Sequence, residues 1–324
     1  MTPGKRMVVN IDNITLVETL LQYFFIVGLS PLFAGIFSKV KSMVESKKGP
    51  SILQPYYDLA KLLKKETLRP KGSGIVFIYA PYVIFGIYSL ISLIIPALIP
   101  DPIYFTASTD FLGGAIMLLL AAFIKIAAAF GSNSNYSALG VSRMLSFNFL
   151  AEGTLITVFF AVSLITSTNN PYTTNHFLAA NPLQNISVVH IFSTLAFFML
   201  FLYETGKVPV ESEGLMEFGM IDAATNYEYS GKLLAISKWN GYIKQFLLGS
   251  ILLNVFLVPW WLNPTFPWVF LNIPVMFAKW LLLIGIVLVV ETTLAKLRLF
   301  RVLDYLATAF AFSILFLIFT EVML

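Results

Sequence analysis

The chain has 324 residues, of which 58% are hydrophobic and only 12% are charged, and its formal net charge is +4. A mean hydropathy of +0.82 is more apolar than a soluble domain requires, so we classify the chain as an integral membrane protein and expect no nucleic-acid partner. The absence of cysteine excludes disulfides, thiolate zinc sites and cysteine-ligated iron–sulfur clusters on this chain. Because the only histidines are the isolated His176 and His190, we expect neither a metal site nor another cofactor.

Eight apolar stretches are long enough to cross about 30 Å of hydrocarbon at about 1.5 Å per residue. The alternation typical of an outer-membrane barrel is absent, so each stretch is predicted to be a helix and the fold to be all-α. The first stretch is too long for a signal-peptide core and is expected to be retained. The predicted spans are 16–37, 75–99, 111–130, 147–167, 186–203, 245–262, 274–295 and 302–322.

The distribution of positive charge predicts the orientation of these spans. Seventeen of the 21 lysines and arginines fall in four of the predicted loops, and three other loops hold none. By the positive-inside rule the basic loops are cytoplasmic and both termini lie outside the cell membrane. No internal repeat is visible, so residues 1–324 are predicted to form one domain. The basic loops are 39–71, 131–146, 204–244 and 296–301, and the neutral loops are 100–110, 168–185 and 263–273.

The first basic loop, which contains KKGPSILQPYYDLAKLLKK, predicts a short amphipathic helix. Gly49-Pro50 breaks the chain, and Pro55 suits the first turn of a following helix. Apolar side chains would lie on one face and charged ones on another, which permits either a membrane-surface helix or a docking platform for a soluble subunit. The apolar residues are Tyr56, Leu59, Leu62 and Leu63, and the charged ones are Asp58, Lys61, Lys64 and Lys65.

Several ionisable residues fall within predicted spans. Glu152 lies about one turn into an apolar run, where an unpaired charge costs several kcal/mol, so it indicates a functional path. Lys125 lies within the third span, and Glu291 and Asp304 lie near the ends of the last two. Lys279 is expected to extend toward its own end of the span.

A third feature is the acidic segment ETGKVPVESEGLMEFGMIDAATNYEYSG. Glu204 closes the fifth predicted span, and five further carboxylates follow within 24 residues. They could be the scattered charges of a solvated loop, but interleaved apolar residues favour a loop folded back into protein. We expect these carboxylates and Glu152 to form a proton-accepting chain from the cytoplasmic interface toward the middle of the membrane. The five are Glu211, Glu213, Glu217, Asp222 and Glu228.

Together, five motifs in one order resemble the NuoH family of respiratory complex I. The resemblance is greater to the membrane-anchor subunits of energy-converting membrane-bound nickel–iron hydrogenases and of the related membrane-bound sulfane sulfur reductase. It covers nearly the whole chain, and GPSILQPYYDLAKLL, a shortened form of the complex I loop, is its most specific part. The motifs are KKGPSILQPYYDLAKLLKKE, GSNSNYSALGVSRM with Glu152 after it, ETGKVPV, EYSG and ETTLAKLRLFR.

This resemblance implies a subunit that joins a hydrophilic electron-transfer arm to antiporter-like subunits that pump protons or sodium ions. Iron–sulfur clusters, and a nickel–iron centre in the hydrogenase branch, would lie on partner subunits, and ferredoxin would act through the arm. The basic loops would dock the hydrogenase-like catalytic and iron–sulfur subunits. The docking residues would be Lys39, Lys41, Gly49, Pro50, Gln54, Pro55, Asp58, Lys61, Lys64, Lys65 and Arg143.

The same resemblance implies a path for protons or charge. Hydrogenase-type relatives continue after their Pro-Val with Asp-Asn-Pro and Thr-His-Leu-Glu, whereas this chain reads ESEGLMEFG and lacks the histidine. The difference favours the sulfane reductase branch over proton delivery to a nickel–iron centre. The path residues would be Lys125, Glu152, Glu204, Glu211, Glu213, Glu217, Asp222, Glu228, Glu291 and Asp304.

The sequence therefore predicts a membrane-anchoring and ion-coupling subunit of a ferredoxin-linked complex, either hydrogenase-like or a sulfane reductase. One alternative is the quinone-module subunit of a complex I-like dehydrogenase that oxidises NADH, F420H2 or ferredoxin, although by resemblance the shortened GPSILQP loop weighs against quinone. Another is an independent transporter, which such large docking loops disfavour. The chain itself would hold no redox centre.

Overall fold

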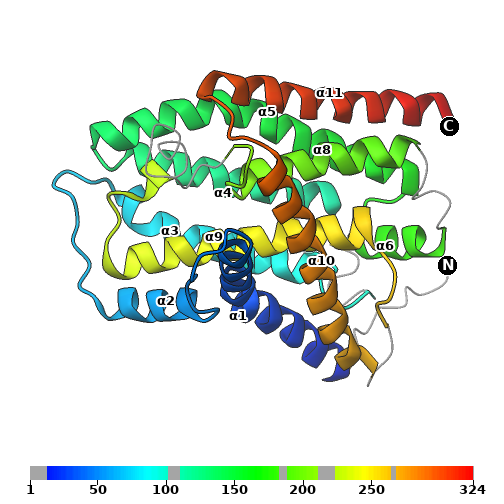
Figure 1. The fold of residues 1–324 in the computed structure, drawn as a ribbon, viewed down its shortest axis with the longest axis horizontal. Coiled ribbons are helices and arrows are strands. Elements are labelled where there is room, and N and C mark those ends of the chain that lie inside the picture. Colours follow the sequence, from blue (N-terminus) through cyan, green and yellow to red (C-terminus); the bar gives the residue numbers. More distant parts are fainter. Residues whose placement is uncertain (1–12, 101–109, 182–187, 211–222, 264–267, 324) are drawn as a thin grey trace, which may run out of the picture.

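The computed structural model describes residues 13–100, 110–181, 188–210, 223–263 and 268–323, and these residues form helices and no strand. Most helices run side by side along the long axis of the molecule, whereas α1 and α10 cross them at a steep angle (Figure 1). The elements are α1 (Asn13–Val44), α2 (Gln54–Lys64), α3 (Ile75–Ile94), α4 (Phe111–Phe130), α5 (Asn135–Thr166), α6 (Pro171–Ala180), α8 (Val188–Glu204), η2 (Ala223–Asn226), α9 (Gly231–Ile251), the π-helical turn η3 (Leu252–Leu257), η4 (Trp268–Leu271), α10 (Asn272–Thr293) and α11 (Leu299–Met323).

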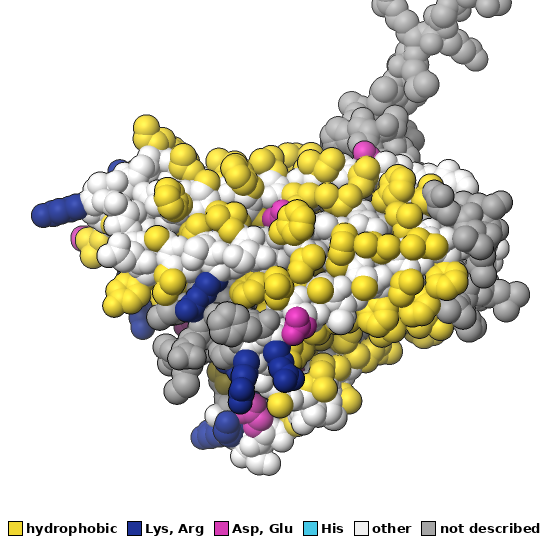
Figure 2. Space-filling view, turned by 90° about the horizontal axis from the view of Figure 1, so that it is seen from above, with side chains coloured by type: hydrophobic (Ala, Val, Ile, Leu, Met, Phe, Trp, Pro, Cys, Tyr) yellow, Lys and Arg dark blue, Asp and Glu magenta, His cyan; other side chains and the backbone are white. Residues whose placement is uncertain are grey.

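Six of the described helical segments are long and apolar enough to cross a membrane, which confirms the all-α prediction and a multi-pass membrane protein. Apolar side chains cover the face seen in Figure 2, and lysine and arginine side chains gather toward one end of it. The segments are Val17–Val44, Ile75–Ile94, Phe111–Phe130, Asn135–Thr166, Trp268–Thr293 and Arg301–Thr320.

The other two predicted spans, 186–203 and 245–262, correspond to helices of a different kind. The helix α8 has 17 residues and is apolar over His190–Glu204. The helix α9 carries three lysines before it continues into η3. The count of eight spans therefore stays a prediction.

The predicted basic loops are shorter in the structure than hydropathy indicated. The loop expected at 131–146 ends where α5 begins, at Asn135, and the one expected at 204–244 ends at Gly231. Hydropathy locates only the apolar part of a helix, whereas alanine, leucine, methionine and arginine continue a helix beyond the lipid. Likewise, α6 occupies part of the neutral loop 168–185, because Asn170 caps it and Pro171 suits its first turn.

The inclined helices α1 and α10 are held to α9 by aromatic packing. The rings of Phe33, Phe246 and Trp280 lie with their centroids 4.9–5.2 Å apart. A Cβ atom at Gly249 would lie only 2.3 Å from the Trp280 ring, so the missing side chain permits this close approach.

Loops that are distant in the sequence meet at one end of the bundle, which we call the basic end. Gly74 N donates to Gly131 O at 3.0 Å, and Leu297 N donates to Pro209 O at 2.9 Å. These bonds join the loops before α3, before α5, after α8 and before α11. Four of the basic segments of the sequence thus form one surface.

A polar strap at the basic end fastens the segment after α2 to the start of α9. Leu68 N donates to Ser230 Oγ at 2.8 Å, and Ser230 Oγ donates to Leu68 O at 2.9 Å. Tyr229 stacks on Phe77 with centroids 4.3 Å apart and donates its hydroxyl to Phe77 O at 3.1 Å. Burial raises the pKa of Tyr229, so the phenol stays protonated and keeps donating. The strap fixes α2 beside α9.

Gly231 is the residue on which this strap depends most directly. Its φ is +50°, and a Cβ atom there would lie 2.3 Å from Glu66 O. We expect Gly231→Ala to destabilise the folded protein by at least about 1–2 kcal/mol, the cost of a left-handed conformation in an L-residue. A thermal unfolding experiment on the purified protein measures this change.

Gly86→Ala is the matched control, because nothing lies within 4 Å of a Cβ atom at this helical glycine. It should leave stability unchanged or raise it slightly, since alanine is the better helix former. Equal destabilisation by the two substitutions would show that the strap does not require glycine.

Candidate functional site

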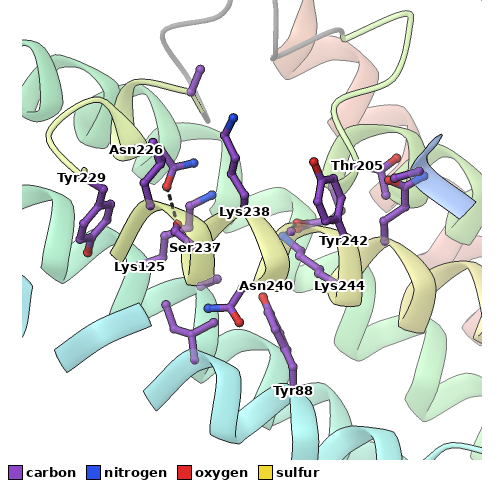
Figure 3. Close-up of a pocket in the computed structure, with 18 of the residues that line it drawn as sticks. Tyr88, Lys125, Thr205, Asn226, Tyr229, Ser237, Lys238, Asn240, Tyr242 and Lys244 are labelled. Atoms are coloured by element: carbon purple, nitrogen blue, oxygen red, sulfur yellow. Dashed lines mark hydrogen bonds and ion pairs between the residues drawn. The ribbon is translucent and has the colours of Figure 1, made fainter. Parts of the chain in front are cut away.

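A cavity of about 590 Å³ lies at the basic end, between α3, α4, α8, α9 and η2 (Figure 3). Its wall is mostly polar where α9 and η2 meet, and Ser237 Oγ donates to Asn226 Oδ1 at 2.6 Å across that junction. Cationic side chains outnumber carboxylates among the described lining residues. The charged ones are Lys125, Lys207, Lys238, Lys244 and Glu204.

The carboxylate of this cavity is paired with a lysine. Lys244 Nζ, on α9, donates to Glu204 Oε2, at the end of α8. The two side chains are 20% and 17% exposed, so solvent screens their attraction less than it screens a surface pair. The pair links the wall of the cavity to the last turn of an apolar helix.

Glu152 lies beside this pair, on α5. Asn148 Nδ2 donates to Glu152 Oε1 at 3.4 Å, and Tyr203 Oη donates to Asn148 Oδ1 at 2.9 Å. The charges of Glu204 and Lys244 act on Glu152 through space. The structure therefore brings together the two carboxylates that the sequence singled out, and adds Asn148, Tyr203 and Lys244, which sequence reasoning missed.

Only part of this cluster had a signal in the sequence. Asn148 is four residues before Glu152, the spacing at which helical side chains meet, and Tyr203 directly precedes Glu204. The partner of Glu204 could not be read in the same way, because Lys244 lies 40 residues away on another helix.

The remaining predicted path residues are dispersed. Lys125 reaches the cavity from α4, whereas Glu228 lies half-buried in the turn before α9 and Asp304 is exposed on α11. Glu291 lies 3.1 Å from Lys41 Nζ and accepts a hydrogen bond from Val208 N at 3.4 Å, so it ties α10 to α1 and to the turn after α8. The other predicted carboxylates lie outside the described residues; they are Glu211, Glu213, Glu217 and Asp222.

The predicted amphipathic helix is present as α2. Pro55 and Leu59 are buried, and the side chains of Lys61, Lys64 and Lys65 are exposed. Leu63, expected on the apolar face, is 40% exposed, because the buried stripe is narrow and centred on Leu59.

Several of the predicted docking residues instead make contacts within the chain. Lys39 Nζ donates to Gly49 O at 3.4 Å, and Gln54 Nε2 donates to Asp58 Oδ1 at 2.9 Å. Of the others, Lys41 is paired with Glu291, Pro50 is exposed and Arg143 is half-buried on α5. The outward basic face of α2 is thus the clearest docking surface.

Lys279 differs from its expected placement. Its side chain does not reach the surface: the residue is 2% exposed, and Nζ donates to Asn254 Oδ1 at 2.9 Å and to Val258 O at 2.7 Å. The expectation that it extends toward the membrane surface is wrong, because two oxygens at the end of α9 hold it inside the protein.

Within the described part of the chain, no three histidine, aspartate or glutamate side chains gather as a metal site would require. His190 is buried with Nε2 3.0 Å from Phe256 O, and His176 is exposed on α6. That the chain holds no cofactor stays a prediction.

The chain is similar to membrane subunits of three characterised complexes. It is 28% identical to hydrogenase-4 component C of Escherichia coli over 76% of either chain, and 28% identical to formate hydrogenlyase subunit 4 of the same organism over 86% of this chain and 90% of that one. It is 26% identical to the NuoH-type membrane component of the NADH-quinone oxidoreductase of Rubrobacter xylanophilus over 89% of each.

The fold is also that of a solved structure. A chain of the membrane-bound sulfane sulfur reductase, an archaeal respiratory membrane complex, superposes with a TM-score of 0.78 at 18% identity, over 94% of this chain and 99% of that one. The family model described as NADH dehydrogenase matches residues 17–321. This chain is therefore a member of the NADH dehydrogenase family, in its NuoH-like form.

Proposed function

We propose that this chain is the membrane-anchoring and ion-coupling subunit of a ferredoxin-linked respiratory complex. It would join a hydrophilic redox arm, docked at the basic end, to antiporter-like subunits that pump protons or sodium ions. The names of the hydrogenase-4 and formate hydrogenlyase relatives support a place in a multi-subunit complex. The observation that carries the proposal is the cluster of Glu152, Glu204 and Lys244 between the cavity and the apolar bundle.

This cluster suits the conversion of a charge change in the arm into a proton movement in the membrane. Lys244 neutralises Glu204 at the cavity wall, and Glu152 lies deeper, on a spanning helix. In apolar surroundings charges interact more strongly than in water, so a negative charge or a proton that arrives at the cavity shifts the balance within the pair. Glu152 then experiences a different potential and can take up or release a proton.

The lysines of the cavity and of α2 supply the matching surface for the arm. Four lysines line the cavity, and three more point outward from α2. Charge complementarity speeds the encounter of two partners and sets their orientation. We therefore infer that the docked surface of the arm is acidic, in preference to the alternative in which α2 lies on lipid headgroups.

The terminal acceptor distinguishes this proposal from the quinone alternative. The ESEGLMEFG segment without histidine favours a sulfane reductase type of complex. The size of the cavity and the similarity to a membrane component of an NADH-quinone oxidoreductase favour quinone, since small-molecule sites have volumes of about 300–1,000 Å³. The purified complex, supplied with reduced ferredoxin and with protons, polysulfide or quinone in turn, identifies the acceptor.

Removal of the titrating groups should uncouple the complex. We expect Glu152→Gln and Glu204→Gln to lower the number of ions moved per electron at least about tenfold, since positioned proton-transfer groups contribute about 10²–10⁴-fold. Assembly should survive, because the amide keeps the shape of the carboxylate. The measurement is gradient formation per electron in proteoliposomes, with subunit stoichiometry determined alongside.

Glu45→Gln is the control for these variants, because Glu45 is exposed and pairs with Lys47 on the loop before α2, away from the cavity. It should retain full coupling. Full coupling in both Glu152→Gln and Glu204→Gln would remove these carboxylates from the path.

Reversal of the charge on α2 should release the arm. The triple substitution of Lys61, Lys64 and Lys65 by Glu replaces three positive charges by three negative ones on the outward face. We expect the membrane subunits to remain assembled while the arm dissociates at moderate salt, as size-exclusion chromatography of the complex would show.

The same charge change at Lys296, Arg298 and Arg301, in the loop before α11, provides the comparison. If the arm stays bound to the α2 variant, or if both variants lose it equally, α2 is not the specific docking surface.

A further inference from the structure

A buried ammonium lies far from the cavity, toward the opposite end of α9. The two acceptors of Lys279 are the amide oxygen of Asn254 and the main-chain oxygen of Val258. Neither oxygen is charged, and the ion pairs among the described residues do not include Lys279. An ammonium surrounded only by dipoles in a membrane-spanning helix is costly, and such residues by default have a function.

The break at the end of α9 holds both acceptor oxygens in place. Over η3 the helix widens to a π-turn, and Val258 N donates to Leu253 O at 2.7 Å. Asn254 Nδ2 donates to Pro96 O at 2.8 Å and to Ala97 O at 3.1 Å, which leaves its Oδ1 directed at Lys279. Single π-turns within helices are frequent at functional sites.

The two neutral oxygens accommodate both protonation states of Lys279. The ammonium has three N–H donors and two acceptors here. When it loses one proton, the amine still has two N–H groups, so both hydrogen bonds can remain. A carboxylate partner would instead favour the charged form alone.

Buried polar atoms on α9 connect this lysine with the cavity. Asn240 and Lys244 line the cavity, and Ser250 lies one turn before Asn254. At about 100° per residue these four positions fall within about 120° of the helix circumference, and they span about 21 Å.

Along this stripe, Asn240 Oδ1 and Ser250 Oγ are buried and have no hydrogen-bond partner among the described residues, and neither has Trp280 Nε1, next to Lys279. Ordered water satisfies most such groups in proteins. Water bound here would form a file from the cavity toward Lys279.

We propose that Lys279 is a proton-carrying residue of the ion-coupling path, connected to the lysine-lined cavity by water held along this face of α9. Nζ takes a proton from water on one side and gives a proton to water on the other, and only N–H and O–H bonds are exchanged. The proposal rests on the proposed ion-coupling function and adds a second station to it.

Two substitutions separate proton transfer from a purely structural bond. Lys279→Gln supplies two N–H donors but cannot titrate, and Lys279→Arg keeps a permanent positive charge. In the purified complex in proteoliposomes, we expect both variants to move at least about tenfold fewer ions per electron. Subunit stoichiometry and electron transfer to the acceptor should stay unchanged. If either variant retains full coupling, Lys279 only fastens α10 to α9, and the proposal is overturned.

Ser250 provides an independent test in case the Lys279 variants do not assemble. Ser250→Ala removes only the orphaned hydroxyl and should lower the ion-to-electron ratio, whereas Ser250→Thr keeps a hydroxyl and should preserve the ratio. Full coupling in Ser250→Ala would contradict the water file. Thr320→Val is the matched control, since this buried hydroxyl on α11 donates within its own helix to Phe316 O.

The wild-type complex separates the two levels of inference. If it forms no ion gradient during electron transfer, the proposed function itself is wrong. If it forms a gradient that the Lys279 and Ser250 variants retain in full, only the role of Lys279 is wrong.

Discussion

The cost of a charge among apolar helices governs the interior of this protein. The chain meets that cost in two ways. At the basic end the carboxylate of Glu204 is neutralised by Lys244, with Glu152 near enough to respond to both charges. Near the opposite end of α9, Lys279 is held by the dipoles of Asn254 and Val258. The first arrangement suits a response to charge that arrives from outside, and the second suits a residue that changes its own charge.

The surrounding helices keep these groups in position. The strap between Leu68 and Ser230 holds α2 against the start of α9, so that the docking surface and the cavity share one framework. At the other end, Phe33, Phe246 and Trp280 fix the inclined helices against the same α9. One helix therefore carries both the lysine at the cavity and the oxygens that hold Lys279, which makes α9 the natural route between a docked arm and the membrane interior.

Sequence reasoning predicted what depends on local pattern. Apolar length located six of the spans, the spacing of Pro55 and Leu59 located α2, and unusual charge marked Glu152 and Glu204. It failed where the answer depends on contacts between distant segments. The pairing of Lys244 with Glu204 needs α8 and α9 to lie side by side.

The error over Lys279 has the same origin. A lysine seven residues into an apolar helix can extend to the surface or find partners inside, and hydropathy does not distinguish the two. The π-turn that supplies its partners has no simple pattern in the sequence. The starts of α5 and α9 were missed because polar residues in a helix and in a loop look alike to a hydropathy scale.

The most direct measurement of the coupling role is infrared difference spectroscopy of the intact complex as the arm is reduced and reoxidised. If electron transfer changes protonation at the cluster, the spectrum contains a carboxyl stretching band that disappears in Glu152→Gln. A spectrum with no carboxyl band, or with a band that the substitution leaves unchanged, would contradict proton transfer at Glu152 and leave the cluster as a structural contact beneath the docking surface.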